Sequence, residues 1–182
     1  MIQKAYTETS IGQCHYRFRE GEGTPIVFLH QTPSSSLMYE EIIQLMPQNT
    51  CIAIDTPGFG MSDDISGNPN VADYGQSIVE ALINIKISDF HLLGHHSGAS
   101  IALYMENEFN HMVSSLTLIG AFLATKEEKE LMKNQTGLDW SPKEDGTHLL
   151  NAWKLAGDIL GAGENLDLRQ RETLDAIRAE AS

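Results

Sequence analysis

The feature of this 182-residue sequence that most constrains its fold is a set of four short, almost continuously apolar runs. They lie at residues 26–29, 51–54, 90–93 and 116–119. Strands with one solvated face alternate polar and apolar residues, whereas strands covered on both faces of a parallel sheet are apolar throughout. The four runs therefore predict a parallel β-sheet that is buried on both faces.

Helical patterns lie between these runs, at residues 37–46, 71–85 and 101–105. In the second, apolar residues recur at steps of three and four, which gives one apolar stripe on a helix that begins near Asn70. Residues 11–19 instead alternate polar and apolar and are followed by a Gly- and Pro-rich turn at 21–25, which predicts a hairpin strand. Because strand and helix alternate along the chain, we expect an α/β fold: a three-layer sandwich around a mostly parallel sheet.

The character of the sequence changes after residue 121, where no further buried strand is predicted. Helix-prone segments at 126–133, 147–156 and 167–181 surround a loop that contains Pro142. We therefore divide the chain into a core at residues 1–124 and a helical lid or cap segment at 125–182. A chain of this length provides one hydrophobic core, since domains usually take about 100–200 residues.

The charge balance restricts the partners that we expect. The 12 Lys and Arg residues face 25 Asp and Glu residues, for a net charge of −13, which excludes nucleic acid because phosphate binding needs a basic patch. No leader-like segment or run of about 18 apolar residues occurs, so we predict a cytoplasmic protein without a membrane partner. Cys14 and Cys51 lie in apolar, strand-like surroundings, which favours reduced thiols.

Three segments that could carry chemistry follow predicted strands, at residues 30–36, 55–63 and 94–98. Asp-Thr-Pro-Gly at 55–58 also occurs in GTPases, but the chain has no G-x-x-x-x-G-K-[ST] loop and no G-x-G-x-x-G loop to hold a nucleotide. His30, His95 and His96 lack the spacing of a metal site. We therefore expect no cofactor and no metal.

Together and in this order, the three segments resemble the α/β-hydrolase superfamily. His30-Gln31 matches the oxyanion loop of that family, residues 55–63 match its D-x-P-G-x-G-x-S segment, and G-H-H-S-G at 94–98 matches its nucleophile elbow. The resemblance implies an α/β-hydrolase fold that lacks its last strands. It also implies an enzyme that hydrolyses a small-molecule ester or related bond, with residues 55–63 as a structural turn.

The main departure from the family pattern is His96, which takes the elbow position where Ser, Asp or Cys is usual. Three interpretations are open: a base or nucleophile, a residue that binds substrate without covalent chemistry, or a degenerate elbow. An imidazole with an ordinary pKa near 6.5 can accept a proton at neutral pH. Ser97 and Gln31 would supply the two amides of the oxyanion hole, and Ser97 is a less favoured nucleophile.

Further residues are assigned by position. His30 could contact substrate or brace its loop, and Trp140 and Trp153 could line a substrate pocket or pack within the lid. The acid and the histidine that the family carries after its later strands are not found in residues 1–182. The chain is thus a fragment of a longer enzyme, or it self-associates through an open sheet edge. The alternative to an enzyme is a non-catalytic binding or interaction module of the same fold.

Overall fold

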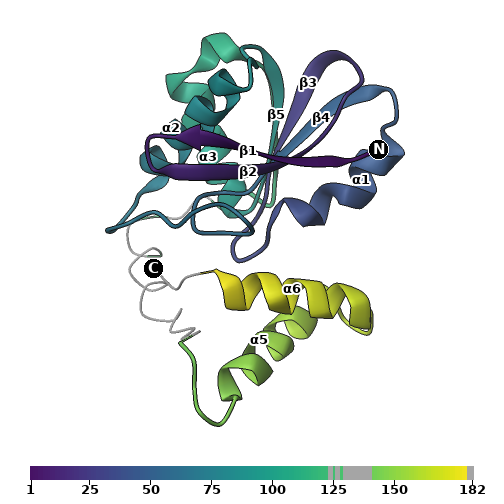
Figure 1. Ribbon diagram of the computed structural model, residues 1–182, viewed down its shortest axis with the longest axis vertical. Helices are drawn as coiled ribbons and strands as arrows, with labels where there is room; N and C mark the ends of the chain where they lie inside the picture. The colour runs from purple at the N-terminus through teal and green to yellow at the C-terminus, as the bar shows by residue number, and fades with distance from the viewer. Residues whose placement is uncertain (123–124, 126–127, 129–140, 180–182) are drawn as a thin grey trace. The chain divides into compact units, whose positions relative to one another are not determined.

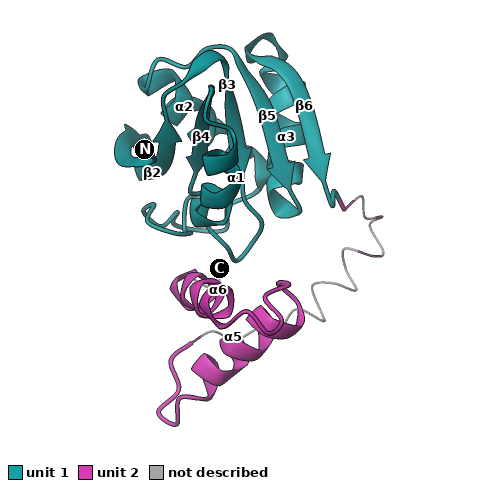
Figure 2. Cartoon of the chain, turned by 90° about the vertical axis from the view of Figure 1, so that its right-hand side faces the viewer, with its two compact units in different colours: residues 1–121 teal, residues 122–182 magenta. Residues whose placement is uncertain are grey.

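The computed structural model describes residues 1–122, 125, 128 and 141–179. The chain divides into two compact units, residues 1–121 and residues 122–182, which are coloured separately in Figure 2. This division falls close to the predicted one, between 1–124 and 125–182. The roles that we assigned to those two parts, core and lid, stay predictions.

A six-stranded mixed sheet forms the centre of the first unit, in the order β1-β2-β4-β3-β5-β6. Its strands are β1 Gln3–Thr9, β2 Gly12–Arg19, β3 Glu22–Leu29, β4 Asn49–Ile54, β5 Phe90–His95 and β6 Val113–Ile119. The β1–β2 and β2–β4 pairs are antiparallel, and the β3–β4, β3–β5 and β5–β6 pairs are parallel. The predicted, mostly parallel α/β sheet is confirmed.

Helices cover both faces of this sheet, as the alternation of side chains along β3 shows. Val27 and Leu29 belong to one buried cluster, whereas Phe28 belongs to another. The helices on the first face are α2 Val71–Asn84 and α3 Ser97–Glu108, and those on the second are the 3-10 helix η1 Ser36–Tyr39 and α1 Glu40–Leu45. This is the predicted three-layer arrangement (Figure 1).

One local prediction, the start of the second helix, is confirmed in detail. Helix α2 begins after Asn70, whose side chain accepts a hydrogen bond from the Ala72 amide while the Asp73 carboxylate accepts one from the Asn70 amide. Cys14 and Cys51 are buried free thiols that lie in different core clusters. Burial raises the pKa of Cys14 to about 12, so this thiol is not a nucleophile at neutral pH.

The structure differs from the prediction at three strands. Strand β1 was not predicted, and β3 begins at Glu22, inside the predicted turn at 21–25, with a register shift between Glu22 and Ile26. The run at 116–119 does form part of β6, but its residues are not buried as predicted: Leu118 and Ile119 are 37% and 46% exposed. Among the described residues, β6 is an edge strand and β5 is its one neighbour.

The second unit contains two helices that pack against each other, α5 Thr147–Asp158 and α6 Leu166–Arg178. The Arg169 guanidinium lies 4.9 Å from the centre of the Trp153 ring, and Arg169 Nε donates to the Trp153 carbonyl at 2.7 Å. Within the described part of the chain, no helix combines the length and the apolar character that crossing a membrane requires.

Candidate active site

The candidate site is centred on a sharp turn between β5 and α3. His96 connects the two elements with φ 50° and ψ −111°, a backbone conformation that is rare outside glycine. Flanking glycines permit the turn: a Cβ on Gly94 would lie 2.4 Å from the Gly98 carbonyl oxygen, and one on Gly98 would lie 2.4 Å from the Leu29 carbonyl oxygen. The turn thus has the backbone features of a strand-to-helix elbow, with the exposed His96 at its tip.

The His96 ring lies against the end of β6. A Cβ on Gly120, which has φ 59°, would come within 2.8 Å of His96 Nε2, so glycine at this position leaves room for the ring. The His96 amide donates to the Ile119 carbonyl at 2.9 Å and holds the turn against the same strand. Within the described residues, no side chain or backbone group hydrogen-bonds the His96 ring.

His95 is the nearest titratable neighbour of His96. The two rings meet edge to face, with centroids 4.7 Å apart. Burial, followed by the charge that His96 can carry, lowers the pKa of His95, which holds His95 neutral at neutral pH. His95 Nδ1 is buried and has no hydrogen-bond partner in the part of the chain that the structure describes. His95 therefore gives His96 no charged partner.

Two backbone amides beside the elbow are free to bind a ligand. Neither the Gln31 amide nor the Ser97 amide donates a hydrogen bond within the described residues. Ser97 is the first residue of α3, and the first amides of a helix have no partner within it. Gln31 belongs to the loop after β3, the strand that pairs with β5. The resemblance to α/β-hydrolases predicts an oxyanion hole at these two amides.

The Ser97 side chain contacts this loop directly. Its Oγ accepts a hydrogen bond from the Thr32 amide at 2.7 Å and donates to Thr32 Oγ1 at 2.9 Å. Sequence reasoning missed Thr32, because no local pattern indicates a contact between residues 65 positions apart. The hydroxyl is thus engaged with Thr32, and in the part of the chain that the structure describes no histidine is hydrogen-bonded to it.

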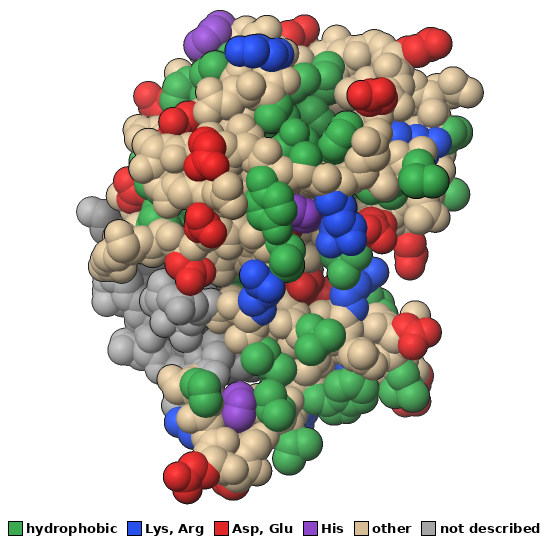
Figure 3. Space-filling model, in the orientation of Figure 1, with side chains coloured by type: hydrophobic (Ala, Val, Ile, Leu, Met, Phe, Trp, Pro, Cys, Tyr) green, Lys and Arg blue, Asp and Glu red, His purple; other side chains and the backbone are tan. Residues whose placement is uncertain are grey.

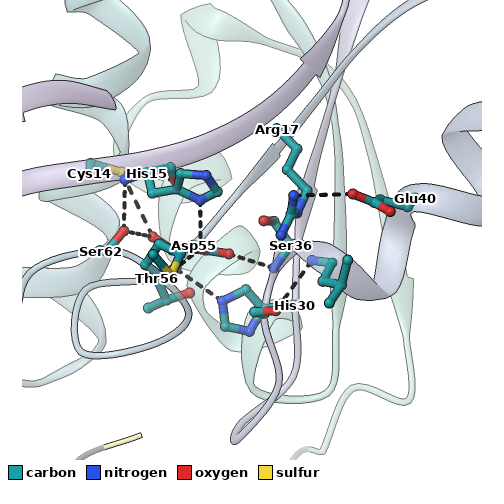
Figure 4. Close-up of polar contacts among 12 residues, drawn as sticks. Cys14, His15, Arg17, His30, Ser36, Glu40, Asp55, Thr56 and Ser62 are labelled. Atoms are coloured by element: carbon teal, nitrogen blue, oxygen red, sulfur yellow. Dashed lines mark hydrogen bonds and ion pairs between the residues drawn. The ribbon is translucent and has the colours of Figure 1, made fainter. Parts of the chain in front are cut away.

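His30 is buried and hydrogen-bonded through both ring nitrogens. Nε2 accepts from the Thr56 amide at 3.0 Å, so the ring proton is assigned to Nδ1, which lies 2.9 Å from the Gln31 carbonyl (Figure 4). The ring therefore links the loop after β3 to the loop after β4. This geometry supports the bracing alternative for His30, and substrate contact by His30 stays a prediction.

Asp55 is the centre of a buried polar network beneath these loops (Figure 4). Its carboxylate accepts from His15 Nδ1 at 2.7 Å, from the Ser36 amide at 2.6 Å and from the Met61 amide at 2.8 Å. Burial by itself raises the pKa of Asp55, but the His15 hydrogen bond, the electrostatic influence of the nearby His30 ring and the hydrogen bonds from the two amides outweigh it and hold the pKa well below its usual range. His15 was missed because a lone histidine in an alternating strand carries no functional pattern.

The pocket roles of the two tryptophans, Trp140 and Trp153, stay predictions. Trp140 lies outside the described residues, and Trp153 is a half-buried residue of α5 that contacts Arg169. A cavity of about 490 Å³ lies elsewhere, between the β1–β2 turn and the start of α2, and Ser10, Asp64 and Asp73 are among the residues that line it. Within the described residues, no group of three His, Cys, Asp or Glu side chains could hold a metal ion.

Comparison with known proteins shows the family. Residues 24–153 match the model of a family described as alpha/beta hydrolase fold. The chain is 26% identical over 102 residues to the (E)-2-((N-methylformamido)methylene)succinate hydrolase of Acinetobacter baylyi, covering 56% of this chain and 38% of that protein. It is 28% identical over 119 residues to haloalkane dehalogenase 2 of Mycobacterium tuberculosis, covering 64% and 41%. The chain belongs to the α/β-hydrolase family and spans about two fifths of the length of these relatives.

Solved structures share the fold. The N-acyl homoserine lactonase AidH superposes with a TM-score of 0.72 at 21% identity, covering 96% of this chain and 67% of that one. The haloalkane dehalogenase DbeA of Bradyrhizobium elkani superposes with a TM-score of 0.72 at 16% identity, covering 98% and 68%. At these identities the likeness establishes the architecture, and the chemistry has to be argued from the residues.

Proposed function

We propose that this chain provides the elbow and the oxyanion hole of a hydrolase that cleaves a small, uncharged ester or a related bond. His96 is the reactive group, and the amides of Gln31 and Ser97 bind the oxyanion. The observation that carries the proposal is the elbow itself, which presents an exposed imidazole beside two backbone amides that donate to no acceptor among the described residues. Membership of a family whose named relatives include hydrolases supports the reaction class.

The reaction follows from these groups. The substrate carbonyl oxygen accepts hydrogen bonds from the two amides, and the neutral His96 ring takes a proton from a water molecule as that water attacks the carbonyl carbon. The resulting oxyanion stays bound to the amides. The imidazolium then gives its proton to the leaving alkoxide, so the products are a carboxylic acid and an alcohol. Each oxyanion donor contributes about 10²–10³ in rate and a general base about 10²–10⁴.

Direct attack by the imidazole is the second possible role of His96. Attack on the ester carbonyl would release the alcohol and leave an acyl-imidazole, which water hydrolyses readily. A rapid-quench mass spectrum distinguishes the two routes, because only attack by His96 adds the acyl group to the protein. Both routes use the same two amides.

The competing function is a binding module without turnover. The observation in its favour is that no described carboxylate or second histidine hydrogen-bonds the His96 ring, whereas catalytic histidines are usually oriented by such a partner. Covalent labelling by a fluorophosphonate or haloalkane probe would exclude this alternative. Tight binding of an ester without hydrolysis would support it.

The proposal is tested by replacing His96. We expect His96→Ala to lower kcat/KM on a panel of p-nitrophenyl esters by at least about a hundredfold, since the base or nucleophile is lost. The matched control is His111→Ala, because His111 is an exposed histidine in the 3-10 helix η2, Asn110–Met112. Thermal unfolding checks that both variants fold. Equal turnover by His96→Ala and wild type would contradict the proposal.

A further inference from the structure

We propose that Ser97 is a positioning residue. Its hydroxyl fastens the oxyanion loop, the loop after β3 that contains Gln31 and Thr32, to the elbow. The inference rests on the proposed function for its catalytic consequence and on geometry for the contact itself. Ser97 would then have two separate tasks: its amide binds the oxyanion, and its side chain holds Thr32, the residue after the other oxyanion amide.

The contact consists of two hydrogen bonds between two residues. Ser97 Oγ accepts from the Thr32 amide at 2.7 Å and donates to Thr32 Oγ1 at 2.9 Å. The Ser97 hydroxyl thus accepts one hydrogen bond and donates the other, while Thr32 donates through its amide and accepts through Oγ1. The two bonds together fix the direction of the Ser97 O–H. We call this pair of bonds the Ser97–Thr32 clasp.

The clasp completes the restraint of one peptide group. The carbonyl of the Gln31–Thr32 peptide accepts from His30 Nδ1 at 2.9 Å and from the Ser34 amide at 2.8 Å, while its N–H donates to Ser97 Oγ. A peptide group held at both ends cannot rotate freely about the adjoining Cα bonds. The Gln31 amide lies in the preceding peptide, so the clasp fixes the group that follows it and limits how far that amide can turn, which favours the preorganisation that an oxyanion donor needs.

Close backbone packing acts on the other side of the same junction. A Cβ on Gly98 would lie 2.4 Å from the Leu29 carbonyl oxygen and 2.6 Å from the His30 carbonyl oxygen, so the start of α3 lies directly against the end of β3. The glycine sets how closely the two segments approach. The clasp sets their orientation, because it joins Ser97, the residue before Gly98, to Thr32, which lies two residues after His30.

The contact is measured without any activity assay, by amide hydrogen exchange of Thr32 in the 182-residue chain. We expect Ser97→Ala to speed exchange at Thr32 by about tenfold, the scale of one lost hydrogen bond, and to shift the Gln31 amide resonance. Ser97→Thr keeps the hydroxyl and should restore protection. Ser100→Ala is the matched control, since Ser100 is an exposed serine of the same helix. Unchanged exchange at Thr32 in Ser97→Ala would overturn the clasp.

The catalytic consequence has its own readout. Because the oxyanion forms in the transition state, Ser97→Ala should lower kcat on p-nitrophenyl esters about three- to tenfold with little change in KM, and Ser97→Thr should recover kcat. Faster exchange at Thr32 with wild-type kcat would overturn the positioning role. If the wild-type chain hydrolyses no ester, the proposed function fails, and exchange at Thr32 with the Gln31 shift decides the clasp alone.

Discussion

At the scale of single residues, the histidine of the elbow is accompanied by a glycine at the end of β6. Any side chain at residue 120 would contact the His96 ring. A bulky elbow residue and a missing side chain at residue 120 are therefore parts of one arrangement. The functional consequence is that position 120 determines where the imidazole can lie.

Gly120→Ala tests this relation. The added Cβ would lie 2.8 Å from His96 Nε2, so the ring has to move, and we expect ester turnover to fall at least about tenfold. The control Gly67→Ala places alanine at a positive φ of 92° with nothing within 4 Å, which isolates backbone strain. When Gly120→Ala is combined with His96→Ala, we expect no further loss of activity. An additive loss in the double variant would show that residue 120 acts independently of His96.

Some site residues can be predicted from sequence and others cannot, for a physical reason. Gln31, His96 and Ser97 lie in short segments where glycines and strand ends make a local pattern, so the motif finds them. Thr32, His15 and Gly120 depend on which distant backbone lies beside them. Residues 32 and 97 lie 65 positions apart, so no local sequence pattern indicates their contact.

At the scale of elements, the buried carboxylate of Asp55 joins three parts of the fold. It lies after β4, accepts from His15 on β2, and accepts from the first amide of η1 at Ser36 (Figure 4). The network thus holds the loop after β3 and the helix after it against the sheet. Its role is to support the site, and the reaction that we propose does not use it.

Asp55→Asn should destabilise the fold by about 3 kcal/mol at neutral pH, because it removes one partner of a buried pair. The folded pKa of Asp55 lies below the unfolded one, so the unfolded chain takes up this proton first as the pH falls. The stability that the ionised carboxylate adds is therefore complete above about pH 4 and declines below it. Urea unfolding at several pH values should show the gap between variant and wild type narrowing below that point; a constant gap would refute the assignment.

The strand elements show where sequence patterns fail. The central strands were predicted because their apolar runs are buried on both faces, whereas β1 has an exposed and intermediate pattern and few apolar residues. The start of β3 contains Gly23 and Pro25, which are turn residues by preference. A register shift between Glu22 and Ile26 lets the strand contain them, and that shift depends on the neighbouring strand β4.

At the scale of the whole molecule, β6 leaves apolar side chains exposed at one edge of the sheet. Leu118 and Ile119 are 37% and 46% exposed. Acidic side chains, by contrast, are spread over the face drawn in Figure 3. An unpaired apolar edge strand favours association, so we predict that the 182-residue chain self-associates.

Sedimentation across a concentration series measures this association. We expect the mass to rise with concentration, and Leu118→Lys to keep the chain monomeric because a charge on an edge strand opposes pairing. Leu45→Lys serves as the control, since Leu45 is 81% exposed on α1. A monomer at every concentration, or equal association of Leu118→Lys and wild type, would contradict the prediction.

The family and the sheet unit follow from the sequence, while the role of the second unit does not. Helices α5 and α6 were predicted from periodicity, but periodicity does not say whether Trp153 meets a substrate or only Arg169. A function that the chain shares with its longer relatives has to be demonstrated at the turn that carries His96.

The most direct test is therefore a comparison of His96→Ala and Ser97→Ala on the same ester. We predict that His96→Ala loses at least about a hundredfold in kcat/KM, the scale of a general base. Ser97→Ala should lose about tenfold or less, because the Ser97 amide remains and only the hydrogen bonds of its hydroxyl to Thr32 are lost. The opposite order, with Ser97→Ala inactive and His96→Ala unchanged, would make Ser97 the nucleophile and contradict the central role of His96.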